Sequence, residues 1–257
     1  MRSIRLAATI VLLTAGAVNA QAPTVPAQLK VMTSGGFAAP LAQLLPEFEK
    51  VSGISVVVTR GGSQGPGPDT IAAQLRRGVP ADMVIMSREG LNDLIAEDRI
   101  VAHSDIALAS TPLGLSVRAG AAKPDIGTLD ALRQTLLRAR SVTFPASTSG
   151  TYLTGSLFPR LGIEHEMAAK SSNAGVAAVA RGDAELTIQP QSELLHVSGT
   201  DFVGPLPAQA QFISVFSAAL VSGSSNEAAA RQLIEFLSSG KTSQALPAHG
   251  MSPAGAH

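Results

Sequence analysis

The sequence has no cysteine and no tryptophan among its 257 residues, and it has a single tyrosine. The absence of cysteine excludes disulfides, thiolate metal sites, cysteine nucleophiles and a lipoprotein anchor, which requires a cysteine at the cleavage point. Without such cross-links the chain must be stabilised by its core, and its length suffices for one large domain or two small ones. The composition, 45% hydrophobic and 4% aromatic, predicts an α/β protein rich in alanine, valine and leucine.

An excess of charge of either sign is also missing, since 19 basic residues face 19 acidic ones. No basic stripe with interleaved aromatic residues is present, which leaves a nucleic-acid role without support. The attraction for any anionic ligand must therefore be local. The five histidines are scattered without metal-ligand spacing, so we expect neither a metal nor another cofactor.

Long apolar runs are absent except at the N-terminus. There a short basic region precedes the almost wholly apolar stretch 6–18, and Val18, Asn19 and Ala20 place small residues where a signal peptidase reads. This pattern predicts a cleaved signal peptide over residues 1–20 and export to the periplasm, because the apolar stretch is too short to span a bilayer. Loss of Arg2 and Arg5 leaves 17 basic against 19 acidic residues, a net charge of −2.

Apolar strand-like runs alternate with amphipathic segments along the rest of the chain. Strands are predicted at 29–32, 54–59, 82–86, 113–117, 141–144, 185–189 and 212–221. Helices are predicted after residue 36 and at 71–75, 128–138, 152–161, 176–181 and 227–237. This alternation is typical of a parallel sheet covered by helices on both faces, where ligands bind at the carboxyl ends of the strands.

Three clusters of glycine, serine and threonine follow predicted strands and precede predicted helices. They are Thr33-Ser34-Gly35-Gly36, Arg60-Gly61-Gly62-Ser63-Gln64-Gly65 and Ser147-Thr148-Ser149-Gly150. The first turn of a helix carries N–H groups without intrahelical partners and the positive end of the macrodipole, so it attracts anions. Each cluster alone also fits an ordinary helix cap or turn. Together they predict an oxyanion site.

Several segments, in order along nearly the whole mature chain, carry a family resemblance. They are 29–34, the Gly78-Val79-Pro80-Ala81-Asp82-Met83-Val84-Ile85 stretch, 149–152, 181–185, and the final strand and helix. These segments resemble the periplasmic molybdate-binding-protein group of type 2 solute-binding proteins. The resemblance implies two α/β lobes joined by two hinge crossovers, with lobe 1 formed by 27–111 plus 212–257 and lobe 2 by 112–211. It also implies a monomer that traps a small anion between the lobes and serves an ABC transporter permease.

The chain departs from the molybdate-binding pattern in three places. Gly36 stands where that group presents a serine, and the region of its cleft tyrosine falls at Gln189-Pro190-Gln191. Arg60 adds a guanidinium, which matches a carboxylate bidentately, whereas tetrahedral oxyanion binders of this kind use neutral donors. A surface arginine at a strand end is the alternative interpretation of Arg60. If Arg60 faces the cleft, a di- or tricarboxylate fits better than molybdate.

One branch of this family is enzymatic: the aconitate isomerases interconvert trans- and cis-aconitate by an allylic proton shift. That reaction needs carboxylate clamps and a general acid or base, for which Tyr152 and Asp69 are the candidates. Capture of a carboxylate and its isomerisation therefore remain as two hypotheses for one site. The expected ligand-binding residues are Thr33, Ser34, Gly35, Gly36, Arg60, Gly62, Ser63, Ser147, Ser149, Gly150, Thr151, Tyr152, Gln189 and Gln191.

Overall fold

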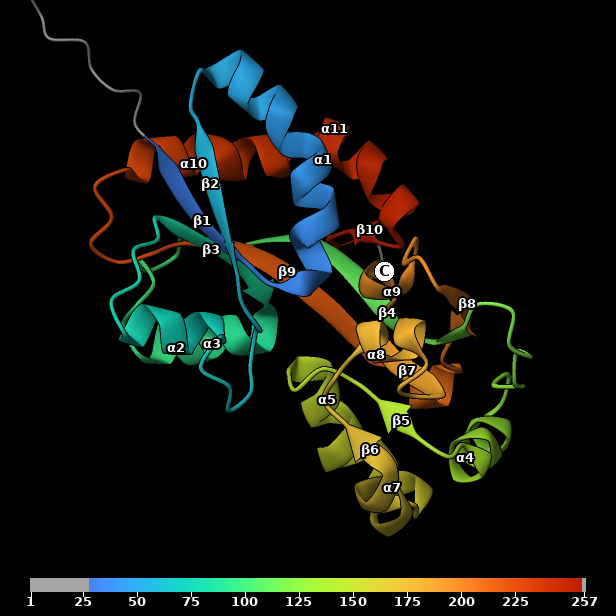
Figure 1. Ribbon diagram of the computed structural model, residues 1–257. Coiled ribbons are helices and arrows are strands. Elements are labelled where there is room, and N and C mark those ends of the chain that lie inside the picture. Colours follow the sequence, from blue (N-terminus) through green and yellow to red (C-terminus); the bar gives the residue numbers. More distant parts are fainter. Residues whose placement is uncertain (1–27, 256–257) are drawn as a thin grey trace, which may run out of the picture.

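The computed structural model describes residues 28–255 (Figure 1). The predicted signal peptide at 1–20 lies outside the described residues. Within 28–255, no helix combines the length and apolar character that crossing a membrane requires.

Ten strands form one connected sheet in the order β2-β1-β3-β9-β4-β7-β5-β6, and β8 and β10 also pair with β4. The strands are β1 Leu29–Thr33, β2 Val56–Arg60, β3 Met83–Ser87, β4 Ile106–Arg118, β5 Val142–Thr143, β6 Ser171–Ser172, β7 Leu186–Pro190, β8 Thr200–Pro205, β9 Ile213–Leu220 and β10 Ser252–Pro253. β1 runs parallel to β2 and β3, but β9 is antiparallel to both β3 and β4. The expectation of a purely parallel sheet is therefore wrong, because β9 returns from a distant part of the chain rather than from a neighbouring βαβ unit.

The helices cover this sheet. They are α1 Gly35–Ser52, α2 Ile71–Arg76, α3 Arg88–Ala96, α4 Leu129–Arg138, α5 Thr148–Tyr152, α6 Phe158–Leu161, α7 Glu164–Lys170, α8 Val176–Arg181, α9 Gln191–Leu194, α10 Glu227–Leu237 and α11 Gly240–Ala245, with a π-helix at Leu153–Leu157 and 3₁₀ turns at Ala208–Ala210 and Leu246–His249. The helix predicted at 152–161 begins earlier, at Thr148, and includes the π-helix. α3, α7 and β8 were not predicted.

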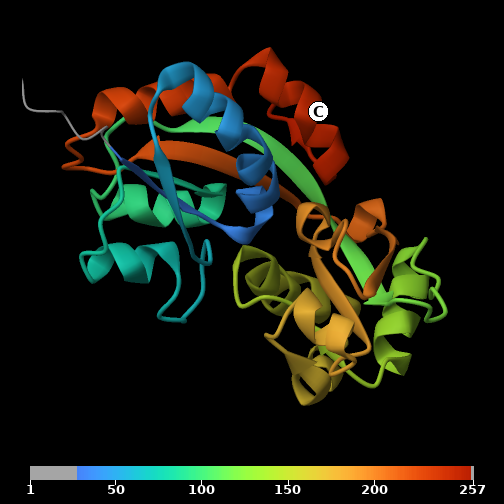
Figure 2. The same ribbon diagram turned by 45° about the horizontal axis from the view of Figure 1, so that its top comes forward.

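β4 is the strand that joins the two parts of the sheet, as Figures 1 and 2 show. It pairs with β9 as far as Pro112 and with β7 from Leu113 onward. The sequence predicts only the second half of β4, because a proline lacks the N–H group that a strand interior normally uses. Here Pro112 lies where the strand changes partner, so the missing donor is tolerated.

The hydrophobic core divides at the same place. Two clusters of buried side chains draw their members from 29–109 and 216–251, whereas a separate cluster draws its members from 113–210. We call 29–112 with 213–253 the first unit and 113–212 the second unit. The predicted lobe boundaries at 111/112 and 211/212 stay a prediction, which this separation of cores supports.

Candidate functional site

A cavity of about 230 Å³ lies between the two units. The first unit contributes Ser34, Gly35, Gly61, Gly62, Ser63, Ser87, Ser214 and Phe216, and the second contributes Pro145, Ser147, Thr148, Ser149, Pro190 and Glu193. Parts of all three Gly/Ser/Thr clusters therefore meet around one space. We call it the inner cavity.

The first wall of the inner cavity is built at the start of α1. Ser34 has extended backbone angles (φ −81°, ψ 164°) before α1, yet its side chain makes no cap hydrogen bond. Its Oγ is buried without a partner among the described atoms, and the residue is only 3% exposed. Buried hydroxyls are usually hydrogen-bonded, so this one and the first-turn N–H groups of α1 are donors available to a ligand.

The opposite wall offers a matching group. Ser149, in the first turn of α5, is 2% exposed, and its Oγ also has no hydrogen-bond partner among the described atoms. Two residues with unpartnered hydroxyls thus line one cavity from different units. Such a pair suits a ligand that carries oxygen atoms at both ends, because each wall can donate to one end.

A second helix terminus at the inner cavity belongs to α3. Ser87 ends β3 and caps α3, its Oγ accepting from Gly90 N at 3.3 Å. Ser63 Oγ in turn accepts from Ser87 N at 2.9 Å. The helix predicted at 71–75 is confirmed as α2, and the chain folds back before it so that Gly62 pairs with Thr70.

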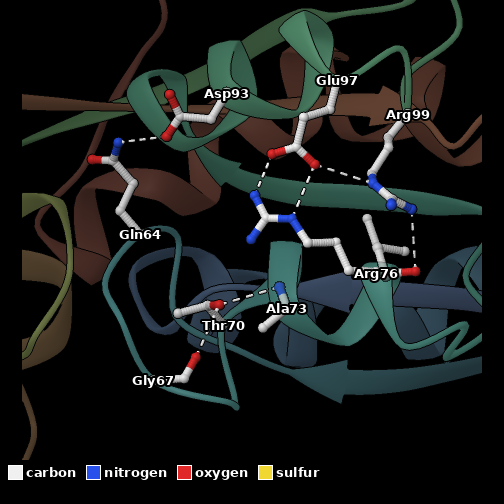
Figure 3. A network of polar contacts seen from close by, with 9 residues as sticks. Gln64, Gly67, Thr70, Ala73, Arg76, Asp93, Glu97 and Arg99 are labelled. Carbon is white, nitrogen blue, oxygen red and sulfur yellow. Dashed lines mark hydrogen bonds and ion pairs between the residues drawn. The ribbon is translucent and has the colours of Figure 1, made fainter.

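Hydrogen bonds connect the two units beside the inner cavity. Thr148 Oγ1 donates to Gln64 Oε1 at 3.0 Å and lies 2.7 Å from Ser87 Oγ. Because the Thr148 proton is used by Gln64, the Ser87 hydroxyl is the donor in the second bond. Gln64 Nε2 donates to Asp93 Oδ2 at 2.8 Å, as Figure 3 shows. The loop 61–70 is thereby attached both to α3 and to the second unit.

The same loop is stabilised at its far end. Thr70 Oγ1 donates to Gly67 O at 3.2 Å and accepts from Ala73 N at 3.2 Å, which caps α2 (Figure 3). Arg76 of α2 and Arg99 both bind the carboxylate of Glu97, at the end of α3. These contacts hold the end of the loop and α2 against α3 independently of any ligand.

Glu193 on α9 is the titratable side chain of the inner cavity. Its Oε2 accepts from Gln189 Nε2 at 2.7 Å. Its Oε1 lies against α1, since a Cβ added at Gly35 would be 3.0 Å from that oxygen. Burial raises the pKa of Glu193, while the hydrogen bond from Gln189 and the charge of Arg60 act in the opposite direction. The sequence analysis did not single out this residue.

A second hollow, of about 450 Å³, adjoins the inner cavity and shares Gly35 and Glu193 with it. We call it the vestibule. Arg60, Gln189, His196 and His249 line it together with Ala39, Val176, Ser192, Leu195 and Val197. Arg60 is exposed and lies in the vestibule rather than in the inner cavity. Burial, and then the charge of His196, lower the pKa of His249.

Six of the predicted site residues line the inner cavity: Ser34, Gly35, Gly62, Ser63, Ser147 and Ser149. Arg60 and Gln189 line the vestibule instead. Thr151 opens to a separate hollow beside Gln64. The wall residues that the sequence analysis did not assign to the site are Gly61, Ser87, Pro145, Thr148, Pro190, Glu193, Ser214 and Phe216. Of these, Ser87 had a sequence signal, since a serine at a strand end precedes leucines at helical spacing.

The remaining predicted residues lie behind the walls. Thr33 donates to Ser34 O, and Gly36 is covered by the ring of Phe216. Gly150 packs against the carbonyl of Pro145, and Gln191 lies beside Gly250.

Neither predicted proton carrier is among the residues that line the inner cavity. The hydroxyl of Tyr152 donates to Ala210 O at 3.1 Å, and its ring stacks on Phe212. Asp69 uses its backbone carbonyl to accept from Gly62 N and from the Gln74 side chain. Both residues therefore serve the framework around the cavity in this structure.

A larger hollow of about 600 Å³ lies near the start of β3 and the end of β9. Its central acid, Asp82, accepts from Lys30 N at 2.7 Å, from Ser224 Oγ at 2.7 Å and from the amide of Asn226. These polar groups therefore have hydrogen-bond partners within the protein. The inner cavity, where buried hydroxyls lack partners, is therefore the better candidate site despite its smaller volume.

Residues 29–252 match the family described as bacterial extracellular solute-binding protein. The chain belongs to this family. Among its relatives is a protein from Pseudomonas sp named aconitate isomerase, which is 38% identical over 229 residues, or 88% of this chain and 87% of the relative. The predicted resemblance to molybdate-binding-like solute-binding proteins is confirmed.

Solved structures share the fold of this solute-binding protein. The periplasmic molybdate-binding protein of Azotobacter vinelandii superposes with a TM-score of 0.69 at 22% identity, covering 87% of this chain and 98% of that one. A sulfate-binding protein from Mycobacterium tuberculosis gives a TM-score of 0.64 at 17% identity, covering 89% and 88%. The mixed α/β fold is thus that of periplasmic binding proteins.

We expect Glu193→Gln to raise the melting temperature of this solute-binding protein at neutral pH. The folded state holds the Glu193 proton more tightly than the unfolded chain does, because burial raises the pKa of this carboxyl. Ionisation then costs stability, and this cost grows from the ordinary glutamate pKa of about 4.3 up to the raised folded value. Thermal melts of both proteins between pH 4 and 8 test this, with the exposed Glu235→Gln as control. A gain in melting temperature that is equally large at pH 4 would contradict the raised pKa of Glu193.

Proposed function

We propose that this protein closes over a small tricarboxylate and interconverts trans- and cis-aconitate by an allylic proton transfer. The observation that carries the proposal is a carboxyl group, that of Glu193, in a lining whose other described residues are glycines, serines, a threonine, two prolines and a phenylalanine. A site that only captured an anion would gain nothing from it, since an ionised carboxylate repels an anionic ligand. A proton-transferring site needs such a group.

Recognition of carboxylates is supported by the two walls. The hydroxyls of Ser34 and Ser149 and the first turn of α1 offer donors to carboxylates on either side of the inner cavity. Arg60 in the adjoining vestibule suits a further carboxylate, since its planar guanidinium can bind two oxygens at once. Three carboxylates on a three-carbon chain match this distribution better than a compact tetrahedral oxyanion.

The same donors would serve the reaction. Removing a proton from the methylene carbon of aconitate spreads negative charge over the allylic system and its carboxylate oxygens. Donors already oriented toward those oxygens stabilise this charge without rearrangement at the moment of reaction. Return of the proton to the former vinyl carbon completes the shift of the double bond. The relative named aconitate isomerase, at 38% identity, supports this chemistry.

The fold fits a cleft that opens and closes. In this proposal the two units are the lobes of a type 2 periplasmic binding protein, with a discontinuous first lobe and hinges where β4 and the start of β9 cross between them. Closure completes contacts from both walls, so a ligand favours the closed state. The mature protein would be a non-lipidated monomer in the periplasm. A capture protein of the same shape would instead deliver its ligand to an ABC transporter permease.

Proton NMR of trans-aconitate incubated with the mature protein tests the function. We expect the signals of cis-aconitate to appear. Thermal melts with citrate, both aconitates, sulfate and molybdate measure binding separately, and a ligand at a hundred times its dissociation constant should stabilise the fold by about 2.7 kcal/mol. Clear binding of aconitate with an unchanged spectrum would identify a capture protein. No stabilisation by any of these anions would contradict both hypotheses.

A further inference from the structure

We propose that Glu193 is the single proton carrier of this isomerisation, taking the proton from one end of the allylic system and returning it to the other. The inference rests on the proposed function and assigns its catalytic group. Among the described residues that line the inner cavity, Glu193 is the only one with a carboxyl, imidazole, amine, guanidinium or phenol group.

The position of Glu193 is suited to this role. It lies at the boundary between the inner cavity and the vestibule, and it lines both. On the facing side is Gly35, whose missing side chain allows the carboxylate to approach the first turn of α1, since a Cβ there would lie 3.0 Å from Oε1. The carboxylate therefore sits beside the N–H groups that would hold a substrate carboxylate, within reach of its neighbouring carbons.

A chain of hydrogen bonds orients the carboxylate. Thr187, which is fully buried, donates from Oγ1 to Gln189 Oε1 at 3.1 Å. This bond leaves the Gln189 amide nitrogen directed at Glu193, where it donates to Oε2 at 2.7 Å. Gly175 closes the other side, since a Cβ there would be 3.1 Å from Gln189 Oε1 and its φ of +64° favours glycine. One carboxylate oxygen is thus held, and the other faces α1.

The surroundings of Glu193 act on its two protonation states in opposite directions. The Gln189 hydrogen bond and the Arg60 charge favour the carboxylate, which is the form that accepts a proton. Burial favours the acid, which is the form that returns it. A carrier must use both forms in one turnover, so opposing influences of this kind suit its task.

Other titratable groups are placed less well. Tyr152 donates to Ala210 O and accepts from Arg160, away from the cavity lining. His196 and His249 line only the vestibule, where their Nε2 atoms bond to Ala248 O and Gln43 Oε1. Because these side chains lie outside the inner cavity, Glu193 is the titratable group placed to reach a substrate bound between Ser34 and Ser149.

The step balances without another reactant. The Glu193 carboxylate accepts a proton from the methylene carbon, the C–H bond breaks, and its electron pair joins the double bond to form a delocalised allylic anion. The resulting carboxylic acid then gives the proton to the former vinyl carbon, where a new C–H bond forms. Glu193 regains its charge, the double bond has moved by one position, and nothing is oxidised or reduced.

Glu193→Gln tests the assignment, because the amide keeps the shape but cannot accept the proton. We expect the isomerisation rate to fall about 10²- to 10⁴-fold, while stabilisation by trans-aconitate in thermal melts is retained. Glu235→Gln, on the exposed face of α10, should leave the rate unchanged. An amide variant whose rate is within threefold of wild type would overturn the inference. Absence of turnover in the wild type itself would instead contradict the proposed function.

Two further readouts separate catalysis from a structural role. In D₂O, a single carrier returns part of the original proton, so early product should contain less deuterium than exchange with solvent would give. Gln189→Leu removes the donor that favours the carboxylate. It should move the acid limb of the kcat/KM profile to higher pH. Full deuteration from the first turnover together with an unmoved profile would count against Glu193 as the carrier.

Discussion

Gly65→Ala is expected to weaken the binding of trans-aconitate by about 5- to 150-fold. A Cβ at Gly65 would lie 2.0 Å from the carbonyl oxygen of Ala146, and the backbone φ of +115° is one that other residues rarely adopt. Gly65 belongs to the first unit and Ala146 to the second, so the clash arises where the units approach. Forcing an atom into packed neighbours costs about 1–3 kcal/mol, and 1.4 kcal/mol corresponds to a tenfold change in affinity.

The clash with Ala146 should affect closure rather than folding. Gly65 lies in the loop 61–70, and a protein that opens slightly escapes the contact with Ala146 while both cores remain intact. Gly67→Ala is the matched control in the same loop, because a Cβ there meets nothing within 4 Å. Calorimetric titration should show weaker binding for Gly65→Ala only. The melting temperature of free Gly65→Ala should also fall, because the positive φ at this position strains an alanine whether the protein is open or closed. Equal affinities for the two variants would show that this contact plays no part in closure.

Gly36→Ser is expected to destabilise the protein by about 1–3 kcal/mol and to create no affinity for molybdate. The substitution restores the serine that the molybdate-binding pattern presents at this place. Here, however, a Cβ at Gly36 would lie 2.0 Å from Cζ of Phe216, whose ring is 3% exposed and lines the inner cavity. The aromatic ring occupies the space of the missing side chain. A serine must therefore displace packed atoms.

Urea unfolding and calorimetry with molybdate measure the two parts of this prediction. Gly240→Ser, at the first position of α11, is the control, because a Cβ there has nothing within 4 Å. Its free energy of unfolding should stay close to that of the wild type. A Gly36→Ser variant that was as stable as the control and bound molybdate would contradict the prediction. It would mean that the ring of Phe216 can move aside without cost in stability. The difference from molybdate binders would then rest on Gly36 alone.

The parts of the site that the sequence predicted are those with local causes. Ser34, Gly35, Ser147 and Ser149 lie at helix starts, where capping preferences and orphan N–H groups leave a recognisable pattern. Gly62 and Ser63, from the second cluster, also line the inner cavity. Gly62 lies beside the start of α2, since its carbonyl accepts from Ile71 N, whereas Ser63 lies beside the start of α3, since its Oγ accepts from Ser87 N.

The missed elements have long-range causes. α3 contains Gly90, and glycine is a weak helix former. A Cβ at Gly90 would lie 2.2 Å from Ser63 O, so the glycine is required by close packing against the loop 61–70. The first half of β4 is stabilised by pairing with β9, more than 90 residues away in the chain. Glu193 follows Pro190 in an ordinary polar segment, and nothing in that segment marks it as a site residue.

The sequence by itself determined the α/β class, the predicted export signal, the family resemblance and three Gly/Ser/Thr clusters that predict an anion site. These follow from composition, periodicity and capping, which act over a few neighbouring residues. The tertiary structure decided which clusters face each other, that Arg60 lies in the vestibule, that Phe216 fills the space beside Gly36, and that Glu193 lies against Gly35. Each of these depends on how two separately packed cores approach each other, and that approach brings together residues far apart in the chain.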